Sequence, residues 1–240
     1  MNNFQEIKKS WKTVESAKKL RLLCAKPNEK EHLSAWFFRL FSIYLTRICL
    51  VLGINSNQVT LLSFLSGLVG GIFFVGGHFL IGSLCFLLFY MFDNVDGEIA
   101  RYKKTSSLFG NWLDIVVGHI LYPYFFLSLG LGLFLNTNGW LFLFWGAVGA
   151  IAKLLERSVP KPEIPGAPQV DYSKKVVERG WRTWIGHIVK YPIMLPLAIL
   201  ASLFDKMNWF LTFIALYSLT FAFGKFYLAG LRQYQAEKNN

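Results

Sequence analysis

Apolar residues occur along this chain in long runs that short polar or basic segments separate. Six runs are long enough to cross a bilayer, near residues 58–76, 79–101, 107–134, 139–157, 185–204 and 208–231. Runs of about 20 apolar residues are typical of membrane helices. The pattern therefore predicts an all-α integral membrane protein with six transmembrane helices.

A further apolar run at residues 35–53 contains Arg39 and Arg47. An arginine at the centre of a bilayer costs roughly 2.5 kcal/mol or more. We therefore expect this segment to be an interfacial amphipathic helix ahead of the six spans, with its arginines reaching toward water. Residues 4–23 show a second amphipathic pattern, in which apolar residues recur at helical spacing between lysines.

These patterns divide the chain into three parts. We expect a basic cytoplasmic arm at residues 1–34, a membrane domain at 35–232 and a short cytoplasmic tail at 233–240. Four of the eight prolines lie in residues 160–172, which we expect to form a cytoplasmic loop.

Composition and charge agree with a membrane protein. The chain is 54% hydrophobic and only 16% charged, whereas soluble domains average about 25% charged residues. The net charge is +11, and the basic residues lie mostly between the apolar runs. This distribution favours contact with anionic lipid over nucleic acid, and it predicts that both termini are cytoplasmic. The compact chain favours a bacterial inner (cytoplasmic) membrane.

An acidic stretch interrupts this apolar pattern at residues 92–120, "FDNVDGEIARYKKTSSLFGNWLDIVVGHI". Helical spacing places one set of its residues on a shared face of the second span: Asp93, Asp96, Gly97, Ala100 and Arg101. Gly110 and Asp114 share a face of the third span, and the short turn between the spans lets the two faces meet.

Three aspartates would then gather near the inner end of the two helices, where their negative charge requires protons or cations. Carboxylate oxygens suit Mg²⁺ or Mn²⁺, and Arg101 is suited to hold a phosphate or to orient a carboxylate. A charge network that only joins helices and an ion pathway in a transporter are the alternatives at this stage.

The same residues resemble the signature of the CDP-alcohol phosphatidyltransferases, D-x2-D-G-x2-A-R-x8-G-x3-D-x3-D. Seven positions agree in type and spacing: Asp93, Asp96, Gly97, Ala100, Arg101, Gly110 and Asp114. The resemblance extends more weakly to "NQVT" at 57–60 and to the layout of residues 35–232. In that segment we expect Asn57 or Thr60 to cap the first span.

The resemblance implies a membrane enzyme, commonly a homodimer, in phospholipid or related lipid or glycan biosynthesis. Such an enzyme transfers a phospho-group from a CDP-linked donor to an alcohol acceptor and releases CMP. Two divalent ions held by Asp93, Asp96 and Asp114 would bridge the diphosphate. Gly97, Ala100, Arg101 and Gly110 would shape the nucleotide pocket, and Asn57 and Thr60 would lie beside it.

One position departs from the signature, because Gly118 stands where the last aspartate is expected. In the family this aspartate is taken to deprotonate the acceptor hydroxyl. His119 is the candidate replacement, since a neutral imidazole is a suitable general base near pH 7. A regular helix, however, would set His119 about 140° from Asp114 around its axis.

Three cations near the inner ends of the later spans are candidates for binding the acceptor: Lys153, Arg157 and Arg182. They would suit an acceptor that carries phosphate, such as a polyol phosphate, although snorkelling alone also explains each one. The sequence favours a transferase. A non-catalytic relative that binds nucleotide or metal, or acts as a scaffold, is the alternative, and a transporter ranks last.

Overall fold

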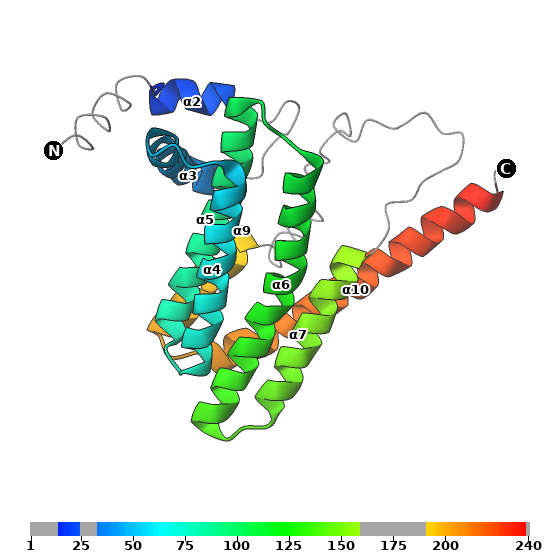
Figure 1. Cartoon of the computed structure of the whole chain (residues 1–240). Helices are drawn as coiled ribbons and strands as arrows, with labels where there is room; N and C mark the ends of the chain where they lie inside the picture. Colours follow the sequence, from blue (N-terminus) through cyan, green and yellow to red (C-terminus); the bar gives the residue numbers. More distant parts are fainter. Residues whose placement is uncertain (1–13, 25–32, 159–190, 239–240) are drawn as a thin grey trace. The chain divides into compact units, whose positions relative to one another are not determined.

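The computed structural model describes residues 14–24, 33–158 and 191–238, and these ranges contain helices and turns but no β-strand. The all-α prediction is confirmed. The first helices are α2 (Ala17–Leu23), α3 (Leu33–Val51), α4 (Ser56–Val75) and α5 (Phe79–Lys103). They are followed by α6 (Leu108–Thr137), α7 (Leu141–Ser158), α9 (Tyr191–Leu203) and α10 (Met207–Lys238) (Figure 1).

Several sequence predictions lie partly or wholly outside the described residues. Of the amphipathic pattern at residues 4–23, the structure describes the last part, which contains α2. The proline-rich segment at 160–172 and Arg182 fall outside the described ranges.

Among the described residues, four helices are long and apolar enough to cross a membrane, so the chain is a multi-pass membrane protein. They are Ser56–Val75, Phe79–Lys103, Leu108–Thr137 and Met207–Leu231. Large apolar side chains on their outer surfaces are exposed, including Leu61, Leu65 and Ile72 on α4, as expected for helices whose solvent is lipid. Of the other two predicted spans, α7 has 18 residues and carries several charges, and α9 is a shorter apolar helix of 13 residues.

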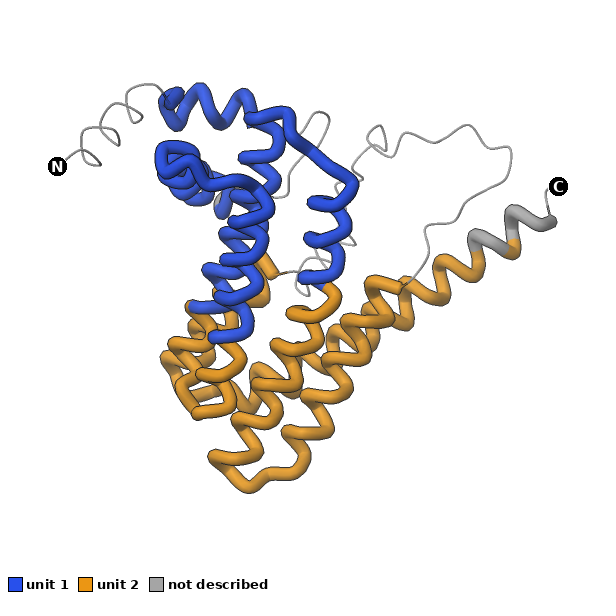
Figure 2. Tube along the Cα trace, viewed as in Figure 1, with its two compact units in different colours: residues 1–69, 85–118 blue, residues 70–84, 119–240 orange. Residues whose placement is uncertain are grey.

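The chain forms two compact units (Figure 2). Unit 1 consists of residues 1–69 and 85–118, and unit 2 consists of residues 70–84 and 119–240. The long helices α4, α5 and α6 each contribute one end to unit 1 and the other to unit 2.

In unit 1, α3 lies across α4 and α5. It is seen nearly end-on in Figure 1, whereas α4 and α5 run along the plane of the view. The buried hydroxyls of Ser42 and Thr46 both donate to the carboxylate of Glu98, at 2.7 and 2.5 Å. Ser42 and Thr46 are one helical turn apart, so a single carboxylate on α5 binds one face of α3.

The start of α4 differs from the sequence prediction. The backbone N–H of Asn55 donates to Oε1 of Gln58 at 2.9 Å, which is the reciprocal half of a capping box. The expectation that Asn57 or Thr60 caps this helix is wrong, because α4 begins at Ser56 and both residues lie within it. The Thr60 hydroxyl bonds to Asp96.

Unit 2 depends on close contact between helix backbones. The turn between α4 and α5 contains Gly77, whose φ of +79° favours glycine. A Cβ at Gly132 would overlap the carbonyl oxygen of Phe74, and a Cβ at Gly130 would lie 2.6 Å from the carbonyl oxygen of Phe142. Small residues at such crossings let membrane helices approach closely.

We expect Gly132→Ala to destabilise unit 2, because the added methyl group can be accommodated only if α4 and α6 separate. Overpacking of this kind costs about 1–3 kcal/mol. The matched control is Gly224→Ala, since a Cβ at Gly224 meets nothing within 4 Å. In detergent solution the midpoint of thermal unfolding should fall for Gly132→Ala and stay level or rise for Gly224→Ala. Equal midpoints in the two variants would contradict this account.

Candidate functional site

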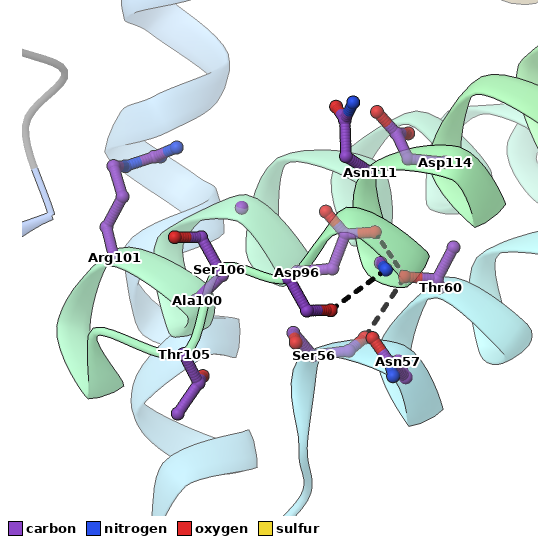
Figure 3. A pocket seen from close by; sticks show the side chains of 13 residues that line it. Ser56, Asn57, Thr60, Asp96, Ala100, Arg101, Thr105, Ser106, Asn111 and Asp114 are labelled. Carbon is purple, nitrogen blue, oxygen red and sulfur yellow. Dashed lines mark hydrogen bonds between the residues drawn. The ribbon is translucent and has the colours of Figure 1, made fainter.

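One pocket in unit 1 gathers most of the residues that the sequence singled out. It encloses about 210 Å³ between the start of α4, the end of α5 and the start of α6 (Figure 3). Eight predicted residues line it: Asn57, Thr60, Asp96, Gly97, Ala100, Arg101, Gly110 and Asp114. Five further residues that the sequence pattern did not single out also line it: Ser56, Thr105, Ser106, Ser107 and Asn111.

The turn between α5 and α6 builds one wall of the pocket. Helix α5 ends where Lys104 adopts a φ of +54° and the N–H of Thr105 donates to the carbonyl of Ala100 at 3.0 Å. Ser107 then caps α6, because its Oγ accepts from the N–H of Gly110 at 3.0 Å. The amino-terminal end of α6 therefore borders the pocket. Its partial positive charge favours an anion such as a phosphate group.

Asp96 is held in a defined position. It is 8% exposed, and its Oδ2 accepts a 2.7 Å hydrogen bond from the hydroxyl of Thr60. The Thr60 oxygen also lies 3.1 Å from the carbonyl of Ser56, so this side chain spans from α4 to α5. A residue that is polar, buried and directed into a pocket in this way is a strong candidate for function.

Two glycines keep the pocket open. A Cβ at Gly97 would lie 3.1 Å from Nη1 of Arg101, and a Cβ at Gly110 would lie 3.1 Å from Oδ1 of Asn57. Any larger residue would therefore press on a polar side chain of the pocket. Glycine at these two positions therefore leaves Arg101 and Asn57 undisturbed.

The structure does not show the expected gathering of three aspartates. Within the described ranges, no group of three His, Cys, Asp or Glu side chains is placed to hold a metal ion. Asp96 and Asp114 line the pocket, whereas Asp93 does not. Asp93 lies three residues before Asp96, which sets it about 4.5 Å further from the end of α5.

The pocket nevertheless offers ligands of the right chemical type for a hard divalent ion. Asp96 and Asp114 contribute carboxylates, and Asn57 and Asn111 contribute amide oxygens. Mg²⁺ is usually bound by one or two protein carboxylates together with oxygens of phosphate and water. Two carboxylates are therefore compatible with such an ion when a phosphate-bearing ligand is present.

The candidate base His119 and two of the candidate acceptor-binding residues, Lys153 and Arg157, belong to unit 2. Helix α6 is α-helical throughout Leu108–Thr137, so His119 keeps an angle of about 140° to Asp114 around the axis. The side chain of Lys153 is 4% exposed and forms a 3.0 Å ion pair with Glu156. The guanidinium carbon of Arg157 lies 4.6 Å from the centre of the Tyr122 ring.

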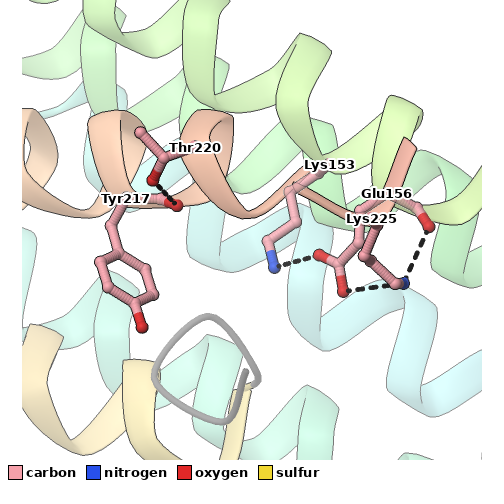
Figure 4. Close-up of polar contacts among 5 residues, drawn as sticks. All are labelled: Lys153, Glu156, Tyr217, Thr220 and Lys225. Atoms are coloured by element: carbon pink, nitrogen blue, oxygen red, sulfur yellow. Dashed lines mark hydrogen bonds and ion pairs between the residues drawn. The ribbon is translucent and has the colours of Figure 1, made fainter. Parts of the chain in front are cut away.

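Glu156 is the residue that sequence reasoning overlooked in unit 2. It binds Lys153, and Lys225 also approaches it, with 3.7 Å between Nζ and Oε1 and 3.2 Å between Nζ and the Glu156 carbonyl (Figure 4). The i, i+3 spacing of Lys153 and Glu156 was visible in the sequence. The ion pair with Glu156 gives Lys153 a protein partner where the sequence suggested an acceptor phosphate.

Comparison with known proteins agrees with the signature. The family model for CDP-alcohol phosphatidyltransferase matches residues 54–232, which is most of the chain. A search of the curated proteins gave no match. The matched range contains the whole pocket and every helix from α4 to α9, together with most of α10. Members of this family are typically transferases that act in the membrane. The chain therefore belongs to the CDP-alcohol phosphatidyltransferase family.

Proposed function

We propose that this protein transfers a phospho-alcohol or phosphatidyl group from a CDP-linked donor to an alcohol acceptor and releases CMP. The acceptor oxygen attacks the phosphorus farther from the cytidine, and the bond from that phosphorus to the bridging oxygen of CMP breaks. The hydroxyl proton passes to a base on the protein. The observation that carries this proposal is the pocket of unit 1, which unites eight of the residues that the signature and its neighbouring segment single out.

The polar groups of the pocket support the binding of a diphosphate. Arg101 and the amino-terminal end of α6 contribute positive charge, and Gly97 and Gly110 leave room beside them. We propose that Asp96 and Asp114, together with Asp93, hold two divalent ions of the Mg²⁺ or Mn²⁺ type. Such ions would neutralise the diphosphate in the transition state. The hydrogen bond from Thr60 would keep Asp96 oriented as a ligand.

His119 is the proposed base in place of the missing aspartate. It follows Gly118, which is the least restricted residue in backbone conformation. Pro123 lies four residues after His119 within α6 and has no N–H to donate to the His119 carbonyl. Gly118 and Pro123 together make this the segment of α6 that bends most readily, and a bend would change the angle between His119 and Asp114.

The proposed acceptor carries a phosphate that Lys153, Arg157 and Arg182 bind. For the membrane arrangement, we propose that α7 and α9 complete six crossings and that α3 lies along the inner surface, with both termini cytoplasmic. The course of α3 across α4 and α5 supports this placement (Figure 1). A homodimer in a bacterial inner membrane completes the proposal.

The two carboxylates that line the pocket provide the first test. We expect Asp96→Asn and Asp114→Asn each to lower CMP release from CDP-linked donors about 100-fold or more, because each loses a charge that acts on the transition state. The control is Asp205→Asn. Asp205 lies in a turn with a φ of +54° that asparagine tolerates, so its activity should stay within about twofold of the original protein. Unchanged turnover in Asp96→Asn and Asp114→Asn would refute the assignment.

The identity of the base is tested at positions 118 and 119. We expect His119→Gln to lower kcat about 10²- to 10⁴-fold while CDP still binds, as measured by calorimetry. Adding Gly118→Asp to that variant should restore turnover, because the carboxylate then occupies the position of the signature aspartate.

Two outcomes would change this assignment. Full activity of His119→Gln would exclude His119 as the base. A non-catalytic relative would bind CDP without turnover, and Gly118→Asp alone would then create activity.

The acceptor site is tested at Lys153. We expect Lys153→Met to raise KM for a polyol-phosphate acceptor about 10-fold, because one charged hydrogen bond contributes about 1.5 kcal/mol, with no change in KM for the donor. The control is Lys206→Met, since Lys206 is exposed in the turn between α9 and α10. If Lys153→Met changed neither KM, Lys153 would serve only as the partner of Glu156.

A further inference from the structure

The guanidinium of Arg101 is bound from outside the α5–α6 hairpin. Its Nε donates to the carbonyl oxygen of Cys24 at 2.7 Å. Cys24 is the residue that ends α2, and its own N–H donates to the carbonyl of Leu20. The last carbonyls of a helix have no donor within the helix, and a cation at this end also interacts favourably with the helix dipole. Arg101 therefore caps α2 as well as lining the pocket.

Apolar packing holds α2 in the position where this hydrogen bond can form. Leu20 is fully buried and packs with Ile43 of α3 and the side chain of Cys24. Tyr102, which follows Arg101 on α5, packs against the same cluster. Helix α2 thus contacts both α3 and the end of α5.

Helix α3 is in turn bound to α5 through Glu98, whose carboxylate accepts from Ser42 and Thr46. The three helices therefore form a closed set of contacts, namely α2 to α3 by apolar packing, α3 to α5 through Glu98, and α5 to α2 through Arg101. Within this set the Nε of Arg101 is directed to α2, whereas Nη1 lies on the side of Gly97, 3.1 Å from where its Cβ would be.

We propose that α2 is a positioning element of the nucleotide pocket, because the Cys24 carbonyl holds the guanidinium of Arg101 against Gly97, where its terminal nitrogens meet the diphosphate of the donor. This inference rests on the proposed function, which supplies the diphosphate. Leu20 acts through Cys24 and Arg101 and is a positioning residue. Helix α2, which precedes the family match, thereby becomes part of the site.

The first experiment compares two leucines of α2 in the full-length protein. Leu20 is buried and Leu22 is 76% exposed, so Leu20→Ser and Leu22→Ser make the same change in different surroundings. We expect Leu20→Ser to raise KM for the CDP-linked donor about 5-fold, since one hydrogen bond contributes about 1 kcal/mol, with kcat within about twofold. Leu22→Ser should have the same KM and kcat as the original protein, and Leu20→Ile, which keeps an apolar side chain, should retain the original KM. A fall in kcat with KM unchanged would overturn the proposal.

The second experiment measures how firmly α2 is docked and does not depend on catalytic turnover. Burial raises the pKa of the Cys24 thiol to about 11, so only about one thiol in 10³ is ionised at pH 8 and iodoacetamide should react slowly. Arg101→Met keeps the side-chain length and removes the donor. The charge of Arg101 itself lowers the pKa of the Cys24 thiol, so the rate constants are compared per thiolate, from the pH dependence of alkylation in each protein. We expect Arg101→Met to accelerate alkylation of the Cys24 thiolate about 5-fold, as measured by mass spectrometry of the peptide, because it weakens the docking of α2 by one hydrogen bond.

These two readouts separate the two proposals. If the original protein turned over no CDP-linked donor, the proposed function would fail. The role of α2 would still be tested by comparing the CDP affinity of Leu20→Ser with that of the original protein. Alkylation of Cys24 that is the same in Arg101→Met and in the original protein would overturn the role of α2. The role of α2 would also be overturned if Leu20→Ser accelerated alkylation of Cys24 but left both the KM for the donor and the affinity for CDP unchanged.

Discussion

A carboxylate that is buried near the end of a membrane helix must find hydrogen-bond donors, since water is largely excluded there. Helix α5 carries two such groups, Asp96 and Glu98, which are 8% and 3% exposed. Thr60 of α4 supplies the donor for Asp96, and Ser42 and Thr46 of α3 supply those for Glu98. The requirement to satisfy these two carboxylates brings three helices together in unit 1, and the pocket depends on that assembly.

Asp96 and Glu98 differ in their hydrogen-bond partners and therefore in the roles that they can have. Both oxygens of Glu98 accept from α3, which suits a structural role and explains why the signature does not specify this position. Asp96 lies in the wall of the pocket beside the start of α6, where phosphate and metal ligands would meet. Asp96 and Glu98 are two residues apart, so different faces of one turn of α5 carry the proposed chemistry and the contact with α3. Arg101 joins the two roles because it contacts both the pocket and α2.

Local spacing predicted much of this arrangement. The short turn after α5 implied an antiparallel pair of helices, and the periodicity of α5 placed Asp96, Gly97 and Arg101 on one face, which the pocket confirms. Spacing also grouped Asp93 with them, one helical turn before Asp96, but Asp93 is not among the residues that line the pocket. The cap of α4 was assigned to Asn57 or Thr60, whereas Gln58 forms it, because contacts with α5 and α6 determine which polar residue turns inward.

The sequence by itself determined the all-α membrane class, the family and the two helices that carry the signature, because these follow from runs and spacings along one chain. Only the tertiary structure decided that Glu98 binds α3 and that Cys24 receives the hydrogen bond of Arg101. The Glu98 and Cys24 contacts join residues 56 and 77 positions apart in the chain. No periodic pattern records such a pairing, because a buried polar group needs only a partner within reach, and packing selects which one that is.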